Sequence, residues 1–181
     1  MRLLAAACAA ALLAPPAPAG AADVARLDCP LNGLTPAQQA AIVPLATNPR
    51  PGATDPAVGA LHAAAQRCAA EFAWNDAEKE AALWYSASWI IQSAMRRQLS
   101  SDGIDVAEIE QLILTDSQLA AALRSPQPAF EPISDFMTRH GGLFARMLEA
   151  RAGHPDHARH LGAFVSSRIS MEAARFRFAG N

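Results

Sequence analysis

Residues 81–95 read AALWYSASWIIQSAM, a run of fifteen positions without a charged side chain. Placed on a helix, this run is apolar on nearly every face, which is typical of a helix at the centre of a bundle or in a membrane. It ends at Arg96-Arg97, and fifteen residues are fewer than the roughly 20 that span a bilayer. The run therefore predicts a buried central helix over about residues 76–99.

The large side chains of this central helix allow two interpretations. In the first, Trp84, Trp89, Ile91 and Met95 pack the core, and Tyr85 and the neighbouring serines find hydrogen-bond partners there. In the second, the aromatic residues and the serines line a ligand pocket between helices. We expect the filled core, because a core uses the same residue types.

Helix signals recur on both sides of this run, whereas strand signals are almost absent. Thr35-Pro36-Ala37-Gln38 has the pattern of a capping box with proline at the first helical position. Asn75-Asp76-Ala77-Glu78 has the pattern of a cap that begins the central helix. The other expected helices cover about residues 35–45, 55–72, 105–114, 116–123, 134–151 and 155–177.

The last two of these helices are expected to form an antiparallel hairpin, because only the short turn RAGHP separates them. Each has apolar residues on one face. These residues are Phe136, His140, Leu143, Phe144, Met147 and Leu148 in the first, and Leu161, Phe164, Val165, Ile169 and Phe176 in the second. The sequence thus predicts an all-α, single-domain bundle of about six helices around a buried central helix, with a C-terminal antiparallel helix hairpin.

The N-terminus has the pattern of a secretory signal peptide. Met1-Arg2 precedes an uncharged apolar run, Leu3 to Leu13, and Ala19-Gly20-Ala21 offers an exit for cleavage. We expect residues 1–21 to be removed and residues 22–181 to form the single domain. The expected location is the periplasm or the cell exterior, and the processed chain is not expected to be an integral membrane protein.

Removal of residues 1–21 leaves two cysteines, Cys29 and Cys68. In an oxidising compartment two lone cysteines usually pair, so we expect a disulfide between them. They are separated by 68 − 29 = 39 positions, which gives a loop-closure stabilisation of about 4 kcal/mol. No C-x-x-C motif occurs, which argues against a thiol-exchange site.

The charge balance excludes one class of partner. Without Arg2 the chain has 14 basic and 17 acidic residues, a formal charge of 14 − 17 = −3. No block of basic residues occurs anywhere, so the electrostatic footprint of a nucleic-acid-binding protein is missing. We expect no nucleic-acid partner.

The stretch GHPDHARH, residues 153–160, allows three interpretations. A metal site could be built on His154, His157 and His160. These positions are three residues apart, which places the side chains progressively around the helix and argues against a common metal ion. The tripeptide His154-Pro155-Asp156 also resembles that of J-domain co-chaperones, but the flanking residues lack that family's basic helix and its apolar pattern. A helix start explains the stretch best, with Pro155 in the first turn and Asp156 at the positive end of the helix dipole. His157 and His160 are then partly buried residues at the edge of the core, and no metal is expected.

Two strings share the pattern L-T-x-x-Q, Leu34 to Gln38 and Leu114 to Gln118. The pair resembles the repeated motif of small exported helical stress proteins of the Spy and CpxP type. This resemblance covers ten residues and implies a cradle-like chaperone or a metal-responsive helper. It assigns a role to no residue of this chain.

Enzyme signatures are absent from the sequence, including G-x-S-x-G, H-E-x-x-H and the glycine-rich phosphate and dinucleotide loops. His140 is the histidine best placed to meet the core, where a lone histidine is usually structural. We expect no catalytic residues and no cofactor. The predicted function is non-catalytic binding or interaction, with an unknown protein or a small apolar ligand as partner. The alternatives are the stress-protein role and a hydrolase-type enzyme whose site leaves no sequence motif.

Overall fold

The computed structural model describes residues 23–46, 55–125, 130–149 and 156–180, and every regular element in these ranges is helical. The all-α prediction is therefore confirmed. The expected signal peptide at 1–21 lies outside the described residues. In chain order the elements are the 3-10 helix η1 (Val24–Arg26), α1 (Cys29–Asn32), α2 (Pro36–Ile42), the 3-10 helix η2 (Val43–Ala46), α3 (Pro56–Phe72), α4 (Asp76–Ser101), α5 (Ala107–Thr115), α6 (Ser117–Leu123), α7 (Phe130–Arg139), α8 (Gly141–Glu149) and α9 (His157–Phe178).

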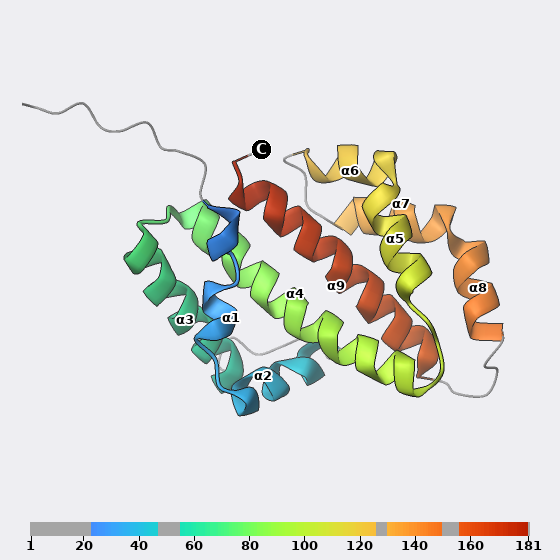
Figure 1. Ribbon diagram of the computed structural model, residues 1–181, viewed down its shortest axis with the longest axis horizontal. Coiled ribbons are helices and arrows are strands. Elements are labelled where there is room, and N and C mark those ends of the chain that lie inside the picture. Colours follow the sequence, from blue (N-terminus) through green and yellow to red (C-terminus); the bar gives the residue numbers. More distant parts are fainter. Residues whose placement is uncertain (1–22, 47–54, 126–129, 150–155, 181) are drawn as a thin grey trace, which may run out of the picture.

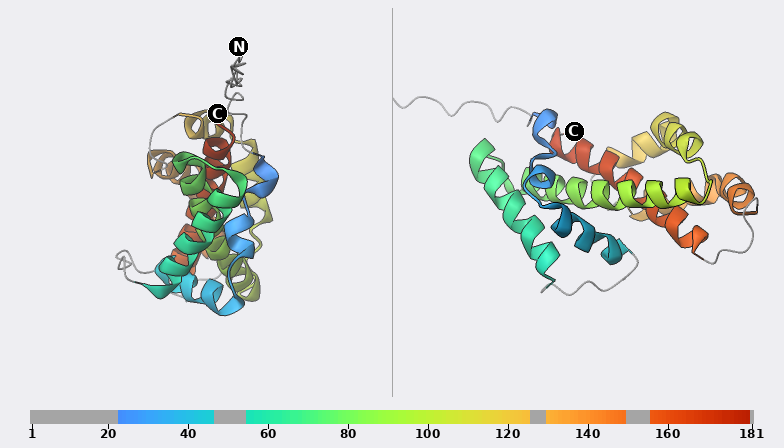
Figure 2. Two further views of the ribbon diagram at one scale, coloured as in Figure 1. Left: turned by 90° about the vertical axis from the view of Figure 1, so that its left-hand side faces the viewer. Right: turned by 60° about the horizontal axis from the view of Figure 1, so that its bottom comes forward.

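The long helices α4 and α9 lie side by side and antiparallel through the middle of the molecule (Figures 1 and 2). Helices α1, α2 and α3 cover one side of this pair, and α5 to α8 cover the other (Figure 1). α4 is thus the central helix that the uncharged run predicts, and it is longer than the expected range at its C-terminal end.

The largest core cluster joins the second half of α4 to α9 and to α5 to α8. Phe136, Phe164 and Ile169 at its centre have no solvent exposure. Burying each such side chain stabilises the fold by about 1.5–3 kcal/mol. A separate N-terminal cluster packs α1, α2 and α3 against α4 through Leu31, Leu34, Ile42, Ala57, Leu61, Ala64 and Ile90.

The Cys29–Cys68 disulfide predicted from the sequence is present and ties α1 to α3, with 6.1 Å between the Cα atoms. The two helices also approach closely without it. A Cβ atom at Gly33, just after α1, would lie 3.3 Å from the Cβ of Ala64, so only glycine fits there without displacement. α3 is therefore held against the N-terminal segment by both a covalent bond and packing.

Two of the predicted helix starts are confirmed in detail. Thr35 accepts a hydrogen bond from the Gln38 N–H, and the Gln38 side chain accepts one from the Thr35 N–H. Asn75 and Glu78 make the same reciprocal pair at the start of α4. Both pairs satisfy donors that a helix N-terminus otherwise leaves free.

The expectation that the large aromatic side chains of α4 are buried is wrong for Trp84 and Trp89, which are 53% and 36% exposed. Met95 is buried as expected and Ile91 partly so. The physical reason is that small side chains face the partner helices. Ala81, Ala82, Ser86 and Ser88 are buried. Ala81 and Ala82 pack, together with Tyr85, against side chains of α9, which are Met171, Ala174 and Phe178. The two indoles are left on the sides of α4.

The C-terminal half differs from the expected hairpin in its pairing. In the described part of the expected helix 134–151, which ends at residue 149, the chain is divided into α7 and α8, with His140 and the pair Gly141-Gly142 at the break. α9 has α4, and not the preceding helix, as its antiparallel partner along its length. Phe136 and Phe144 still pack in the same core as Phe164. In the described part of the chain, no helix combines the length and the apolar character needed to cross a membrane.

Candidate functional site

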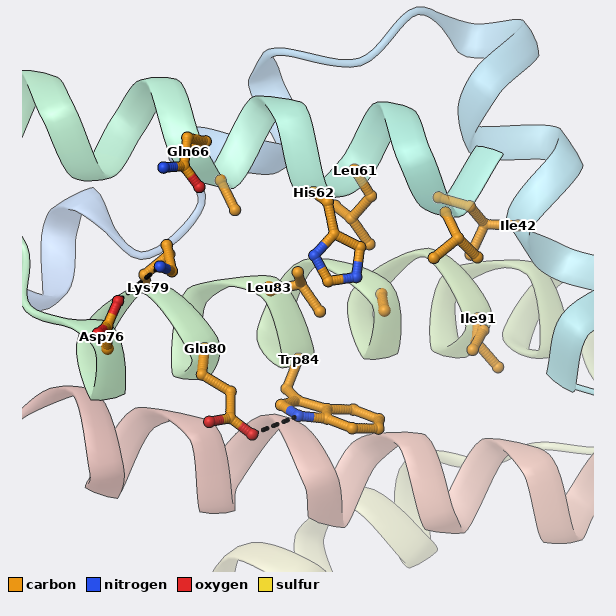
Figure 3. Close-up of a pocket in the computed structure, with 13 residues that line it drawn as sticks. Ile42, Leu61, His62, Gln66, Asp76, Lys79, Glu80, Leu83, Trp84 and Ile91 are labelled. Carbon is orange, nitrogen blue, oxygen red and sulfur yellow. Dashed lines mark hydrogen bonds and ion pairs between the residues drawn. The ribbon is translucent and has the colours of Figure 1, made fainter. Parts of the chain in front are cut away.

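A groove of about 670 Å³ lies between α3 and α4, beside the uncharged run of α4. The two helices diverge from the turn at residues 73–75 that connects them (Figure 2). α3 forms one wall, α4 forms the other, and the end of α2 adds Ile42 (Figure 3). The lining residues are Ile42, Val58, Leu61, His62, Ala65, Gln66, Asp76, Lys79, Glu80, Leu83, Trp84, Ala87 and Ile91.

The α4 wall follows from helical spacing. The lining positions 76, 80, 84, 87 and 91 follow one another at steps of three or four residues, and 79 and 83 lie beside them, so together they form one stripe along the helix. In its middle and far end this stripe carries Leu83, Trp84, Ala87 and Ile91. The facing stripe of α3 adds Val58 and apolar neighbours, so most of the groove is lined by carbon.

Polar side chains gather at the end of the groove nearest the turn between α3 and α4 (Figure 3). Lys79 Nζ lies 2.6 Å from Asp76 Oδ1. The hydrogen bond and the charge of Lys79 lower the pKa of the exposed Asp76 carboxyl. Glu80 and Gln66 complete this end, so the groove is apolar over most of its length and polar at one end.

Trp84 is the largest apolar side chain in the groove and is more than half exposed. Its indole N–H donates to Glu80 Oε1 at 3.4 Å, which holds the ring along the α4 wall (Figure 3). His62 projects from α3 toward α4 (Figure 3). Covering an exposed indole beside an apolar groove with a ligand is favourable, because it removes apolar surface from water.

Of the histidines in GHPDHARH, the described His157 and His160 do not line this groove. His157 begins α9, is buried, and has its Nε2 3.2 Å from Asp102 Oδ2. His160 is partly buried one turn later, as the sequence predicts. His154 and Pro155 lie outside the described residues. Within the described ranges no three His, Cys, Asp or Glu side chains are grouped as metal ligands.

His140, between α7 and α8, contacts the residue that caps α6 and lies outside the groove. Its Nε2 is 3.0 Å from Asp116 Oδ2, and Arg139 Nη2 donates to the same oxygen at 2.9 Å. Asp116 also caps α6 by accepting the Leu119 N–H at 2.8 Å. Burial acts to raise the pKa of Asp116, but these three hydrogen bonds and the charge of Arg139 outweigh it and hold the pKa well below its usual range.

The two L-T-x-x-Q strings have different structural roles. In the first, Thr35 is the cap of α2 and pairs with Gln38. In the second, Asp116 is the cap of α6, and the Thr115 hydroxyl donates instead to the Gln111 carbonyl at 2.8 Å. Capping explains the first string, and the second has the same letters with a different geometry.

Sequence reasoning singled out Trp84 for its helix but missed the α3 wall of the groove. Val58, His62 and Gln66 carry no recognisable motif. Their spacing of four residues was the available signal, because it places them on one helical face. No family model, no curated protein and no solved structure matches this chain. The groove's own chemistry is therefore the basis for the function proposed next.

Proposed function

We propose that this protein is an exported, non-catalytic binding protein that holds an elongated, mainly apolar small molecule in the groove between α3 and α4. One observation carries the proposal: the half-exposed Trp84 belongs to a continuous apolar lining of a groove of about 670 Å³. Ligand pockets typically have volumes of about 300–1,000 Å³ and are lined by apolar and aromatic side chains with a few polar groups.

The shape and the charge distribution of the groove favour an elongated ligand. From Asp76 to Ile91 the α4 wall covers 15 positions, which is about 22 Å along a helix. Polar groups occur mainly at the Asp76 end, so a ligand with one polar end would bind in a single orientation. Its apolar part would cover Leu83, Trp84 and Ala87 and remove their carbon surface from water.

Two observations support the exported location. The uncharged run after Arg2 has the length and flanks of a signal peptide. The disulfide between Cys29 and Cys68 is of a kind that persists in oxidising compartments and is rare where thiols are kept reduced. The periplasm and the cell exterior both satisfy these conditions.

The test is a titration of the exported, oxidised protein with N-phenyl-1-naphthylamine, an apolar dye that fluoresces when it leaves water. We expect saturable binding, and we expect Trp84→Ala to weaken it about tenfold or more, because the lost indole contact is comparable to burying a large apolar side chain. Ala87→Trp should also weaken binding by filling the groove from the α4 wall.

The matched control is Trp89→Ala, since Trp89 lies on the same helix, is also partly exposed and does not line the groove. Its dye affinity should equal that of the unmodified protein. Equal losses in Trp84→Ala and Trp89→Ala, or no saturable binding at all, would refute the proposed groove function.

A further inference from the structure

A second, smaller pocket of about 290 Å³ lies where α4, α5 and α9 meet, and it shares no lining residue with the α3–α4 groove. Three arginines line it: Arg96 from α4, and Arg168 and Arg175 from α9. Only 12% of the Arg168 side chain is exposed, whereas Arg96 and Arg175 are about half exposed. One guanidinium is therefore deep in the pocket and two lie nearer its mouth.

The carboxylates around this pocket do not balance the arginines. Arg96 pairs with Glu110, which also accepts a hydrogen bond from Gln92 Nε2 at 2.9 Å. Arg168 and Arg175 both pair through Nη1 with the same oxygen of Glu172, at 2.5 and 3.5 Å. Three cations thus face two carboxylates, a local charge of 3 − 2 = +1.

The arginines also retain hydrogen-bonding capacity. A guanidinium has five N–H donors in a planar fork. Each of these ion pairs uses one terminal nitrogen, Nη2 of Arg96 and Nη1 of the two α9 arginines. A planar anion of one charge would complete both the charge and the geometry, because carboxylates accept paired N–H bonds from this fork.

Besides the arginines and Glu110, the lining consists of Gln92 and four larger side chains, Tyr85, Trp89, Leu114 and Met171. Trp89 and Leu114 line the pocket as partly exposed large apolar side chains, 36% and 54% exposed. Met171 and the buried Tyr85 add to the lining, and the Arg175 guanidinium lies 5.7 Å from the centroid of the Tyr85 ring. The pocket thus places three arginines beside the partly exposed side chains of Trp89 and Leu114.

We propose that this pocket binds a small aromatic monocarboxylate, with the carboxylate on the arginines and the ring against Trp89 and Leu114. A single negative charge matches the local excess of one positive charge, whereas a phosphate monoester carries about −1.5 to −2 at neutral pH. The pocket volume, just below the usual range for drug-sized ligands, matches a single ring in size. This site is independent of the groove function, and either proposal can fail alone.

The test is a titration with benzoate at constant ionic strength, followed by the indole N–H signals in the ¹⁵N spectrum of the oxidised protein. Three tryptophans give three signals, Trp74, Trp84 and Trp89, which single Trp→Phe variants assign. We expect the Trp89 signal to shift saturably, while the Trp84 signal, which reports on the groove, stays in place. No shift of Trp89, or an equal shift of all three signals, would overturn the proposal.

The variant Arg175→Gln should weaken benzoate binding about tenfold or more, because it removes a hydrogen bond to a charged group. Arg96→Gln gives the same test on α4, should the first variant fail to fold. The matched control is Arg159→Gln, since Arg159 is an exposed arginine of α9 that pairs with Asp156 at 2.7 Å and does not line the pocket. Its affinity for benzoate should be unchanged, and an equal loss in the control would overturn the site.

Two further anions test the ligand class. Acetate has the carboxylate without the ring, and inorganic phosphate has an oxyanion with more charge and no ring. Both are expected to bind at least tenfold more weakly than benzoate, because they leave Trp89 and Leu114 uncovered. Acetate or phosphate binding as tightly as benzoate would overturn the assignment to an aromatic carboxylate.

Discussion

Replacing both disulfide cysteines with alanine tests how much of the stability of this protein comes from one covalent bond. Cys29 and Cys68 are separated by 39 positions, and the loop-closure relation then gives about 4 kcal/mol lost from the free energy of unfolding. The folded state is expected to keep its geometry without the bond. α1 and α3 remain packed through Leu31, Leu61 and Ala64, and Gly33 still allows their close approach.

The assay is urea unfolding followed by far-ultraviolet circular dichroism, on the oxidised protein and on Cys29→Ala/Cys68→Ala. With a slope of about 2 kcal/mol per molar urea, the midpoint should fall by roughly 2 M. The single variant Cys29→Ala is the control, because it breaks the same bond and keeps the other cysteine. A fall in the free energy of unfolding of less than about 1 kcal/mol in both variants would refute the reasoning that the bond acts through the unfolded chain.

Three further variants test other parts of the structure by the same unfolding assay. Phe164→Ala should lower the free energy of unfolding by about 3–5 kcal/mol, because Phe164 is fully buried in the largest core cluster; a loss below 1 kcal/mol would contradict that packing. Asp116→Asn should cost about 2 kcal/mol at pH 7 through weaker bonds to His140 and Arg139. The pKa of Asp116 is lowered in the folded state, so the stabilisation by its carboxylate is present above about pH 4 and is lost as the pH falls. Asp116→Asn should therefore lose less stability on acidification than the unmodified protein. Equal losses in the two proteins would contradict this explanation. Ala73→Gly should raise the free energy of unfolding by about 0.5–1 kcal/mol, because Ala73 ends α3 with a φ of 53°, a left-handed conformation that glycine adopts without strain; a destabilised variant would count against it.

The features that the sequence predicts well are those decided by neighbouring residues. The caps at Thr35 and Asn75 depend on side chains three positions away, and both form as expected. The disulfide is predictable because only Cys29 and Cys68 lie outside the expected signal peptide, and two cysteines have a single way to pair. His157 and His160 at the edge of the core follow from the apolar spacing of the helix that they begin.

The features that the sequence predicts poorly depend on which helices meet and at what angle. The apolar face of residues 155–177 predicts that this helix packs against another helix, but it does not specify which one. Both the preceding helix and α4 have apolar faces, and in the structure the partner of α9 is α4. In the structure Ala81 and Ala82 of α4 pack against α9. The size of Trp84 and Trp89 alone gave the wrong expectation that they are buried. The groove could not be predicted from the sequence for a related reason, since it forms only where α3 diverges from α4.

Along the chain, 157 − 101 = 56 positions separate the start of α9 from the end of α4. Until α9 docks, the face of α4 that carries Ala81, Ala82 and Tyr85 has no partner, so the native core between these two helices cannot form. The contacts of α1 to α3, and the disulfide within them, are closer in sequence and need none of the last residues. Assembly should thus proceed from the N-terminal half, with the α4–α9 pair as the late, slow step because its contacts are the most distant along the chain. A chain that ends before residue 157 would expose Ala82 and Tyr85 to water, and it would be a substrate for aggregation or proteolysis and not a smaller native protein.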